Sequence, residues 1–255
     1  MTETPTATTP TAAMIVIGDE VLSGRTQDAN TQVLARMLGE AGIDLCEARA
    51  IRDEAGVIGA AVNELRARYT YVFTSGGIGP THDDITAEAV ASAMDTPISI
   101  RDDARAVLVA RYGEGEKLTE ARLRMARIPD GAALIDNPVS GAPGFRLGNV
   151  FVMAGVPQVF AAMLDHVRTM VGTGPTMHDV SIPCPFPEGV LGGPLGEVAS
   201  AHPLVSVGSY PRLKPGGGWG VTIVARSRDT DALAAAETAV HAMIEGLAGS
   251  ATDGE

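Results

Sequence analysis

The sequence has few cysteines, few aromatic residues and no long apolar run. Of its 255 residues only 2 are cysteines, and Cys46 and Cys184 lie far apart without a CxxC spacing. Neither a disulfide framework nor a zinc cage is therefore indicated, and we expect both thiols to be small buried groups in a reducing compartment. Aromatic residues make up 4% of the chain, so the core must be aliphatic. No stretch of about 18 apolar residues is present to predict a membrane-spanning helix.

Basic residues are also scarce, since 19 Lys and Arg face 31 Asp and Glu and leave a net charge of −12. Nonspecific binding to nucleic acid or to anionic membranes needs a basic surface, so we expect neither as a partner. A small phosphate ligand remains compatible, because backbone amides and a metal can hold it inside an acidic protein. Residues 1–12 are rich in Thr and Pro, without the apolar core of a signal peptide, and are expected to be a disordered tail of a cytoplasmic protein.

Apolar runs alternate with helical patterns through the first part of the chain. Strands are expected at 13–18, 43–51 and 70–73, each followed by a stretch with helical spacing of apolar residues. This order predicts a three-layer α/β domain with a mostly parallel sheet. We place that domain at 13–173 and a small βαββα domain, which includes a glycine loop at 216–218, at 176–248.

The central motif is Ser75-Gly76-Gly77-Ile78-Gly79-Pro80-Thr81-His82-Asp83-Asp84-Ile85-Thr86, between an apolar run and a helical pattern. Glycines let backbone N–H groups approach a phosphate closely, and a helix N-terminus adds partial positive charge. The adjacent acids Asp83 and Asp84 would repel an anion unless a cation were also present. The motif therefore indicates a phosphate together with a divalent metal. The alternative is a tight βα turn in which Asp84 or Thr86 caps the helix.

Two further acids are expected at the same edge of the sheet. Glu20 lies in a polar loop after the first strand, and Asp53 follows the second strand. Ligands of parallel sheets bind at the carboxyl ends of strands, although either acid could simply cap the next helix. The glycine/proline loop at 136–145 and the junction at Gly155 are expected to wall the same cleft. The basic residues between these segments are assigned to a solvated face without a role: Arg101, Arg105, Arg111, Lys117, Arg122, Arg124 and Arg127.

The central motif resembles the GGxGPTxDDxT signature of the molybdopterin-binding family, and most closely its branch in competence/damage-inducible protein A. Further matches span about 14–171, although Ser140 replaces a usual glycine and Met153-Ala154 replaces a Leu-Pro pair. The resemblance implies a three-layer α/β domain that binds molybdopterin or a nucleotide diphosphate and forms a dimer or trimer. In the adenylyltransferase branch, acids matching Asp53 and Asp84 serve AMP transfer from ATP. In the competence branch, and in a similar domain fused to FAD synthases, the implied reaction is metal-dependent hydrolysis of ADP-ribose or FAD.

Together the motif and the resemblance predict a set of site residues. Asp53 and Asp84 are expected to be catalytic, and Asp84, Asp83 and Glu20 are expected to hold Mg²⁺ or another divalent cation. The residues expected to bind phosphate or pterin are Ser75, Gly76, Gly77, Gly79, Thr81, Asn137, Gly141, Gly144 and Gly155. We expect a metal-dependent nucleotide pyrophosphatase. A molybdopterin adenylyltransferase and a non-catalytic molybdopterin-binding protein are the alternatives.

Overall fold

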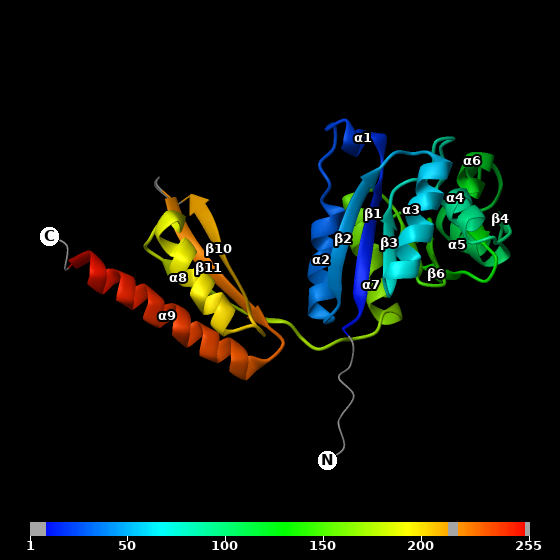
Figure 1. Cartoon of the computed structure of the whole chain (residues 1–255). Coiled ribbons are helices and arrows are strands. Elements are labelled where there is room, and N and C mark those ends of the chain that lie inside the picture. The colour runs from blue at the N-terminus through cyan, green and yellow to red at the C-terminus, as the bar shows by residue number, and fades with distance from the viewer. Residues whose placement is uncertain (1–8, 214–218, 253–255) are drawn as a thin grey trace, which may run out of the picture. The chain divides into compact units, whose positions relative to one another are not determined.

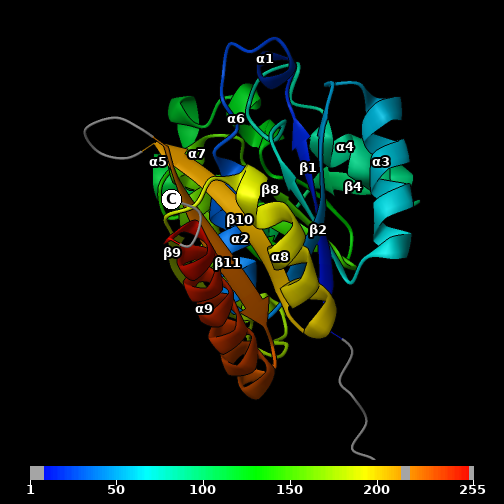
Figure 2. The same cartoon turned by 60° about the vertical axis from the view of Figure 1, so that its left-hand side comes forward.

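The computed structural model describes residues 9–213 and 219–252, which divide after Pro175 into two compact units (Figures 1 and 2). The first strand begins at Thr11, so the last two residues of the expected tail belong to the sheet. Residues 1–8 of that tail and the expected loop at 216–218 lie outside the described residues. Each unit is a separate layered structure with its own core.

The first unit alternates strands and helices along the chain. Its elements are β1 Thr11–Ile17, α1 Asp19–Leu22, α2 Asn30–Glu40, β2 Asp44–Ile51, α3 Ala55–Arg68, β3 Tyr71–Ser75, α4 Thr86–Ala93, β4 Ile98–Ile100, α5 Asp102–Tyr112, a 3₁₀ turn at Gly115–Lys117, α6 Glu120–Arg124, β5 Arg127–Pro129, β6 Ala133–Ile135, β7 Gly144–Leu147, β8 Val150–Met153 and α7 Pro157–Met170. The predicted three-layer α/β class is confirmed.

The main sheet has the order β2-β1-β3-β8-β7-β6. β1 pairs in parallel with β2 and β3, and β3 pairs in parallel with β8. β7 runs antiparallel to both β8 and β6, which makes the sheet mostly parallel with one antiparallel edge. The carboxyl ends of β1, β3 and β8 therefore meet at one edge, and the loops after these three strands carry the candidate site.

Alternate side chains of β1 enter two different cores. Ala13, Ile15 and Ile17 pack with α3, α4 and α5, whereas Met14 and Val16 pack with α2 and α7. This period of two, with both faces apolar, is what a sheet covered by helices on both sides requires. Figure 1 shows α2 on one side of β1 and β3, and α3 and α4 on the other.

Three local expectations were wrong. The polar loop after the first strand contains a one-turn helix, α1, because its backbone amides bond back to Gly18 and Asp19. The long loop at 136–145 ends in strand β7, which pairs with β6 and β8. Cys46 is exposed because it faces outward from the edge strand β2, whereas Cys184 is buried as expected.

The second unit follows the predicted βαββα order. Its elements are β9 His178–Cys184, α8 Glu188–Ala201, β10 Ser206–Leu213, β11 Trp219–Ser227 and α9 Thr230–Thr252. The strands form an antiparallel sheet in the order β10-β11-β9. Apolar residues of α8 and α9, such as Leu191 and Val240, pack against Ile182 and Ile223 of the sheet. None of the described helices is both long enough and apolar enough to cross a membrane.

Candidate phosphate-binding cleft

The glycine loop between β3 and α4 is held against the neighbouring strand ends. Gly76 and Gly77 have positive φ angles of 111° and 69°. A Cβ atom added at Gly76 would lie 2.2 Å from the Ile17 carbonyl oxygen, and one at Gly77 would lie 2.1 Å from the Thr86 Oγ1. Only glycine satisfies both the backbone angles and this close approach. Glycine is therefore required at both positions for the loop to adopt this shape.

Asp84 closes the second half of the loop. Its Oδ2 accepts hydrogen bonds from the Thr81 amide at 2.8 Å and from the Thr81 hydroxyl at 2.5 Å. The Thr86 amide donates to the Gly77 carbonyl at 2.9 Å, which joins the two ends of the loop. Asp84 is therefore a structural residue of the loop as well as a candidate ligand.

Asn30 connects three of the loops at this edge. Its Nδ2 donates to the Ser75 Oγ at 2.6 Å and to the Gly155 carbonyl at 2.8 Å. Asn30 is 5% exposed and Ser75 is 2% exposed, so both hydrogen bonds are shielded from bulk water. Ser75, predicted to bind phosphate, is buried, and its Oγ is the acceptor in this internal link. Asp28 places Asn30, because its Oδ1 accepts hydrogen bonds from the Asn30 and Thr31 amides at 2.9 and 3.2 Å.

Asn137 organises the loop opposite the glycine loop. Its Nδ2 donates to the Ser140 Oγ and to the Ala142 carbonyl at 2.6 and 2.7 Å, and its Oδ1 accepts from the amides of Val139 and Ser140. The side chain is 3% exposed and its polar atoms are all used inside the loop. Asn137 thus shapes the wall of the site rather than presenting a free amide to a ligand.

These loops enclose a cleft of about 610 Å³. One wall is the glycine loop, with residues 78–80 and Asp84, and Glu20 and Thr26 lie at its side. The opposite wall consists of Asn137, Ser140 and Ala142, and the start of α7 with its preceding turn closes the end. A cleft of this volume accommodates a cofactor-sized molecule rather than a phosphate ion alone.

Five of the predicted site residues line this cleft: Glu20, Gly79, Asp84, Asn137 and Gly155. Other predicted residues lie elsewhere. Gly144 is inside β7, where an added Cβ would be 2.4 Å from the Met163 Cε, so it serves core packing. Gly141, with φ of 80°, turns the Asn137 loop beside Arg111. Asp83 and His82 point into solvent, with side chains 70% and 97% exposed.

Asp53 stands next to α1 and does not line the cleft. Its Oδ2 accepts a hydrogen bond from the Asp19 amide at 2.9 Å, at the first residue of α1. Partial burial raises the pKa of Asp53, the hydrogen bond from Asp19 opposes that shift, and the charges of Glu20, Asp19 and Asp83 raise it further. The charges of two other predicted acids, Glu20 and Asp83, thus act on the pKa of Asp53. The hydrogen bond from the Asp19 amide fixes the turn that carries Glu20.

The predicted metal ligands do not form a complete cage. Within the described residues, no group of three or more His, Cys, Asp or Glu side chains is close enough to hold a metal ion. Mg²⁺ is nevertheless commonly held by one or two carboxylates together with substrate phosphates and water. Glu20 and Asp84 line one cleft and are hard oxygen donors of this kind, so they fit an ion that binds together with a phosphate ligand.

Helices α5 and α6 contribute a wall that the sequence did not predict. Tyr112, Arg122 and Met125 line the cleft, and the Arg122 guanidinium lies 4.4 Å from the centre of the Tyr112 ring. The Tyr112 hydroxyl donates to the Ser140 carbonyl at 2.8 Å, which joins this wall to the Asn137 loop. The expectation that Arg122 belongs to a solvated face was therefore wrong. Gly113 and Gly115, both with positive φ, mark the break between α5 and α6, but they do not specify the direction in which α6 runs.

The fold and the cleft define a class of protein. It is a three-layer α/β protein with a strand–glycine loop–helix unit that lines a cleft at the carboxyl edge of a mostly parallel sheet. The chain belongs to the family described as the probable molybdopterin binding domain, whose model matches residues 13–172. Residues 176–249 match a second model, described as the FAD synthase, middle domain.

Similar proteins agree with both matches. A CinA-like protein of Desulfosudis oleivorans is 34% identical over 64% of this chain and 42% of its own length. A probable FAD synthase of Caenorhabditis briggsae is 30% identical over 80% of this chain and 44% of its own. The crystal structure of CinA, of unknown function, from Thermoplasma acidophilum has 33% identity and a TM-score of 0.60, and covers 64% of this chain and 98% of that one. The chain spans less than two thirds of the first curated relatives that it matches.

Proposed function

We propose that this protein is a metal-dependent nucleotide pyrophosphatase that binds a compound of the ADP-ribose or FAD type in the cleft. The observation that carries the proposal is the position of Asp84. It closes the glycine loop through Thr81, and it also lines a cleft of about 610 Å³ together with Glu20. The cleft therefore combines a glycine loop that could bind a phosphate, two carboxylates that could bind a cation and space for an organic group. The similarity to a probable FAD synthase, which extends over 80% of this chain, supports a dinucleotide ligand.

The proposed reaction breaks the phosphorus–oxygen bond that joins the two phosphates. A water oxygen attacks one phosphorus atom, the bridging oxygen leaves with the bonding electrons on the other phosphate, and a proton of the water is released. A bound divalent cation would supply charge neutralisation at the phosphates and orient the attacking water. The glycine-loop amides hold the phosphate oxygens without any reorganisation of the loop. The products are AMP and a phosphorylated fragment.

The acids have different parts in this proposal. Asp84 and Glu20 face the ligand and the cation, because both line the cleft. Asp53 acts as a positioning residue, since its bond to the Asp19 amide fixes the turn that carries Glu20. Asp83, predicted as a metal ligand, is exposed and has the weakest support. We also expect a cytoplasmic protein, and a dimer or trimer, as the resemblance implies for the family.

Substitution of Asp84 by Asn tests the proposal. The Asn Oδ1 can still accept from the Thr81 amide, so the loop should keep its shape and the affinity for ADP-ribose should change less than about tenfold, or 1.4 kcal/mol. Turnover should fall at least roughly 100-fold, because the carboxylate charge is lost at the cation site. Asp165→Asn, on the exposed face of α7, is the matched control. An equal loss of affinity and turnover in Asp84→Asn would count against this role.

Two alternatives use the same cleft. Adenylyl transfer to molybdopterin is supported by the family match over residues 13–172. It predicts AMP transfer from ATP only when a pterin acceptor is present. A non-catalytic binding protein is favoured by the lack of a three-ligand cluster among the described residues. It predicts stabilisation by ADP-ribose or a pterin phosphate without the release of AMP.

A further inference from the structure

A second, much smaller hollow lies on the other side of the glycine loop. It measures about 20 Å³, room for about one water molecule. Ile78, Gly79, Asp84 and Met125 line both this hollow and the cleft, so the same short segment separates them. Any phosphate on the cleft side of Gly79 is therefore next to the groups that line the hollow.

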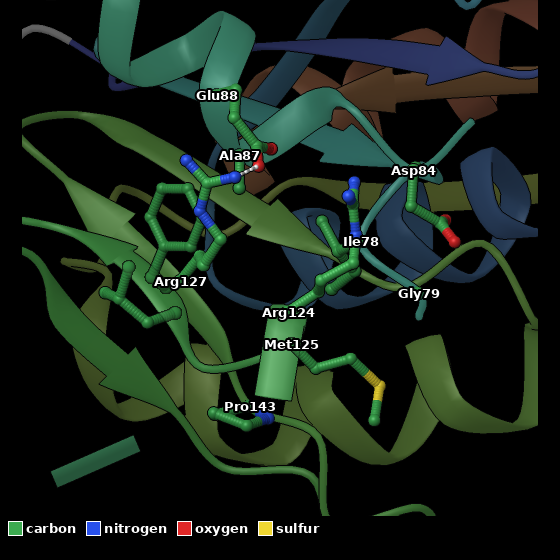
Figure 3. Close-up of a pocket in the computed structure, with 12 residues that line it drawn as sticks. Ile78, Gly79, Asp84, Ala87, Glu88, Arg124, Met125, Arg127 and Pro143 are labelled. Carbon is green, nitrogen blue, oxygen red and sulfur yellow. Dashed lines mark ion pairs between the residues drawn. The ribbon is translucent and has the colours of Figure 1, made fainter. Parts of the chain in front are cut away.

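Arg124 lines the hollow and lacks a partner there. It is the last residue of α6, and its half-buried side chain extends past Ile78 between Glu88 and Asp84 (Figure 3). Its Nε is buried without a hydrogen-bond partner, and no ion pair joins its guanidinium to any described residue. An arginine that is partly withdrawn from water and unpaired is costly, because the group stays charged and carries five donors.

The neighbouring charged groups are already occupied. Arg127 pairs with Glu88 at 2.7 Å, as the dashed line in Figure 3 marks. Arg122 stacks on the Tyr112 ring. The Asp84 Oδ2 accepts from Thr81. Of the two arginines that line the hollow, Arg127 is therefore paired, whereas the guanidinium of Arg124 has no ion pair with any described residue.

We propose that Arg124 is a ligand-binding residue, whose guanidinium contacts a phosphate oxygen of the diphosphate held by the glycine loop. The proposal rests on the proposed function and adds a protein cation to it. A diphosphate placed beside the carboxylates of Asp84 and Glu20 needs positive charge, and a divalent ion bound by those acids would supply only part of it. Arginine matches phosphate geometry by forming two parallel hydrogen bonds, which gives orientation as well as charge.

Binding of ADP-ribose and of adenosine to the full chain, with and without Mg²⁺, tests the proposal. Arg124→Gln should weaken ADP-ribose binding roughly 10- to 100-fold, the range for loss of a charged hydrogen-bonding group, and leave adenosine binding unchanged. Arg124→Lys keeps the positive charge but cannot form the two parallel hydrogen bonds of a guanidinium, so it should bind ADP-ribose more tightly than Arg124→Gln but less tightly than the wild type. Arg36→Gln, on the exposed face of α2, makes the same change in net charge and should have no effect. Unfolding midpoints of all variants show whether the fold is retained.

Each outcome has one meaning. If wild-type protein binds ADP-ribose and Arg124→Gln binds it as tightly as Arg36→Gln does, the role of Arg124 is refuted while the proposed function stands. If the wild-type protein binds neither ADP-ribose nor FAD, the proposed function fails and this inference fails with it. A loss of adenosine binding equal to that of ADP-ribose would show a merely structural role for Arg124 and would also overturn the proposal.

Chemical modification of the wild-type protein gives a second test that does not depend on a variant that folds. Phenylglyoxal reacts with accessible arginines, and the modified positions can be read by mass spectrometry. Saturating ADP-ribose should slow modification of Arg124 at least roughly tenfold, and leave Arg36 unchanged, if the ligand covers the guanidinium. Equal modification of Arg124 with and without bound ADP-ribose would refute the contact.

Discussion

Replacement of Gly76 by alanine should disable the glycine loop and destabilise the first unit. The residue has a φ of 111°, and its amide donates to the Met153 carbonyl at 3.1 Å, so it bridges the ends of β3 and β8. The new Cβ would lie 2.2 Å from the Ile17 carbonyl oxygen. Normal contacts of this kind stay beyond 3.0 Å, so either β1 or the loop must move by nearly an ångström.

The size of the effect follows from these two conflicts. An unfavourable backbone angle costs about 1–3 kcal/mol, and an overpacked contact adds about 1–3 kcal/mol, so the unfolding free energy should fall by roughly 2–6 kcal/mol. Hydrogen exchange of the β3 amides measures this loss within the first unit, independently of the second. Gly59→Ala, within α3, is the matched control. Its Cβ would meet only the Ala93 Cβ at 3.7 Å, and alanine should stabilise the helix by roughly 0.5–1 kcal/mol.

Ligand binding gives the second readout of the same variant. A displaced loop would move residues 78–80 in the wall of the cleft, so affinity for ADP-ribose should fall at least roughly tenfold even where the protein remains folded. The reasoning would be refuted if Gly76→Ala lost less than about 1 kcal/mol of unfolding free energy and bound ADP-ribose as the wild type does.

Two further substitutions test the supports of the site. Asp53→Asn should raise the unfolding free energy at pH 7, because burial raises the pKa of Asp53 in the folded state and so disfavours the charged form there. Protonated Asp53 contributes its full stability to the wild type below the unfolded pKa of about 3.8, and this stability is lost as the pH rises through the folded pKa. The difference in unfolding free energy between Asp53→Asn and the wild type, measured by urea unfolding, should therefore shrink from pH 7 to pH 4. A pH-independent difference would contradict this assignment. Asn30→Ala removes the hydrogen bonds to Ser75 and Gly155, and should lower the unfolding free energy by roughly 2–4 kcal/mol, measured by hydrogen exchange of the β3 amides. The control Asn63→Ala, at an exposed position of α3, should lower it by less than about 0.5 kcal/mol. Equal losses in the two variants would show that the buried hydrogen bonds do not support the site.

The parts of the fold set by local pattern could be predicted from the sequence. Short-range patterns predicted the apolar strand β1, the glycine loop and the proline at the start of α7. The alternation of such strands and helices along the chain was enough to predict a mostly parallel sheet. The antiparallel β7 was missed because its pairing with β6 and β8 depends on contacts across the loop at 136–145.

The candidate site was predictable only where a residue acts through its own loop. Gly79 and Asp84 were found because their motif is continuous in the sequence. Tyr112, Arg122 and Arg124 were not, because α5 and α6 reach the cleft through turns whose direction no local pattern specifies. Asn137 was predicted from its loop, and its partners lie within that loop. Asn30 was not predicted as a site residue, because its partners Ser75 and Gly155 are distant in the sequence.

The most direct test of the central claim is the release of AMP. The full chain would be incubated with ADP-ribose, FAD, NAD or ATP, each with Mg²⁺, Mn²⁺ or Co²⁺ and each with a chelator. We predict AMP from ADP-ribose or FAD only when a divalent ion is present, and none from ATP alone. Failure to release AMP from any of these compounds with any of the three metals would contradict the proposal that the cleft is a pyrophosphatase site.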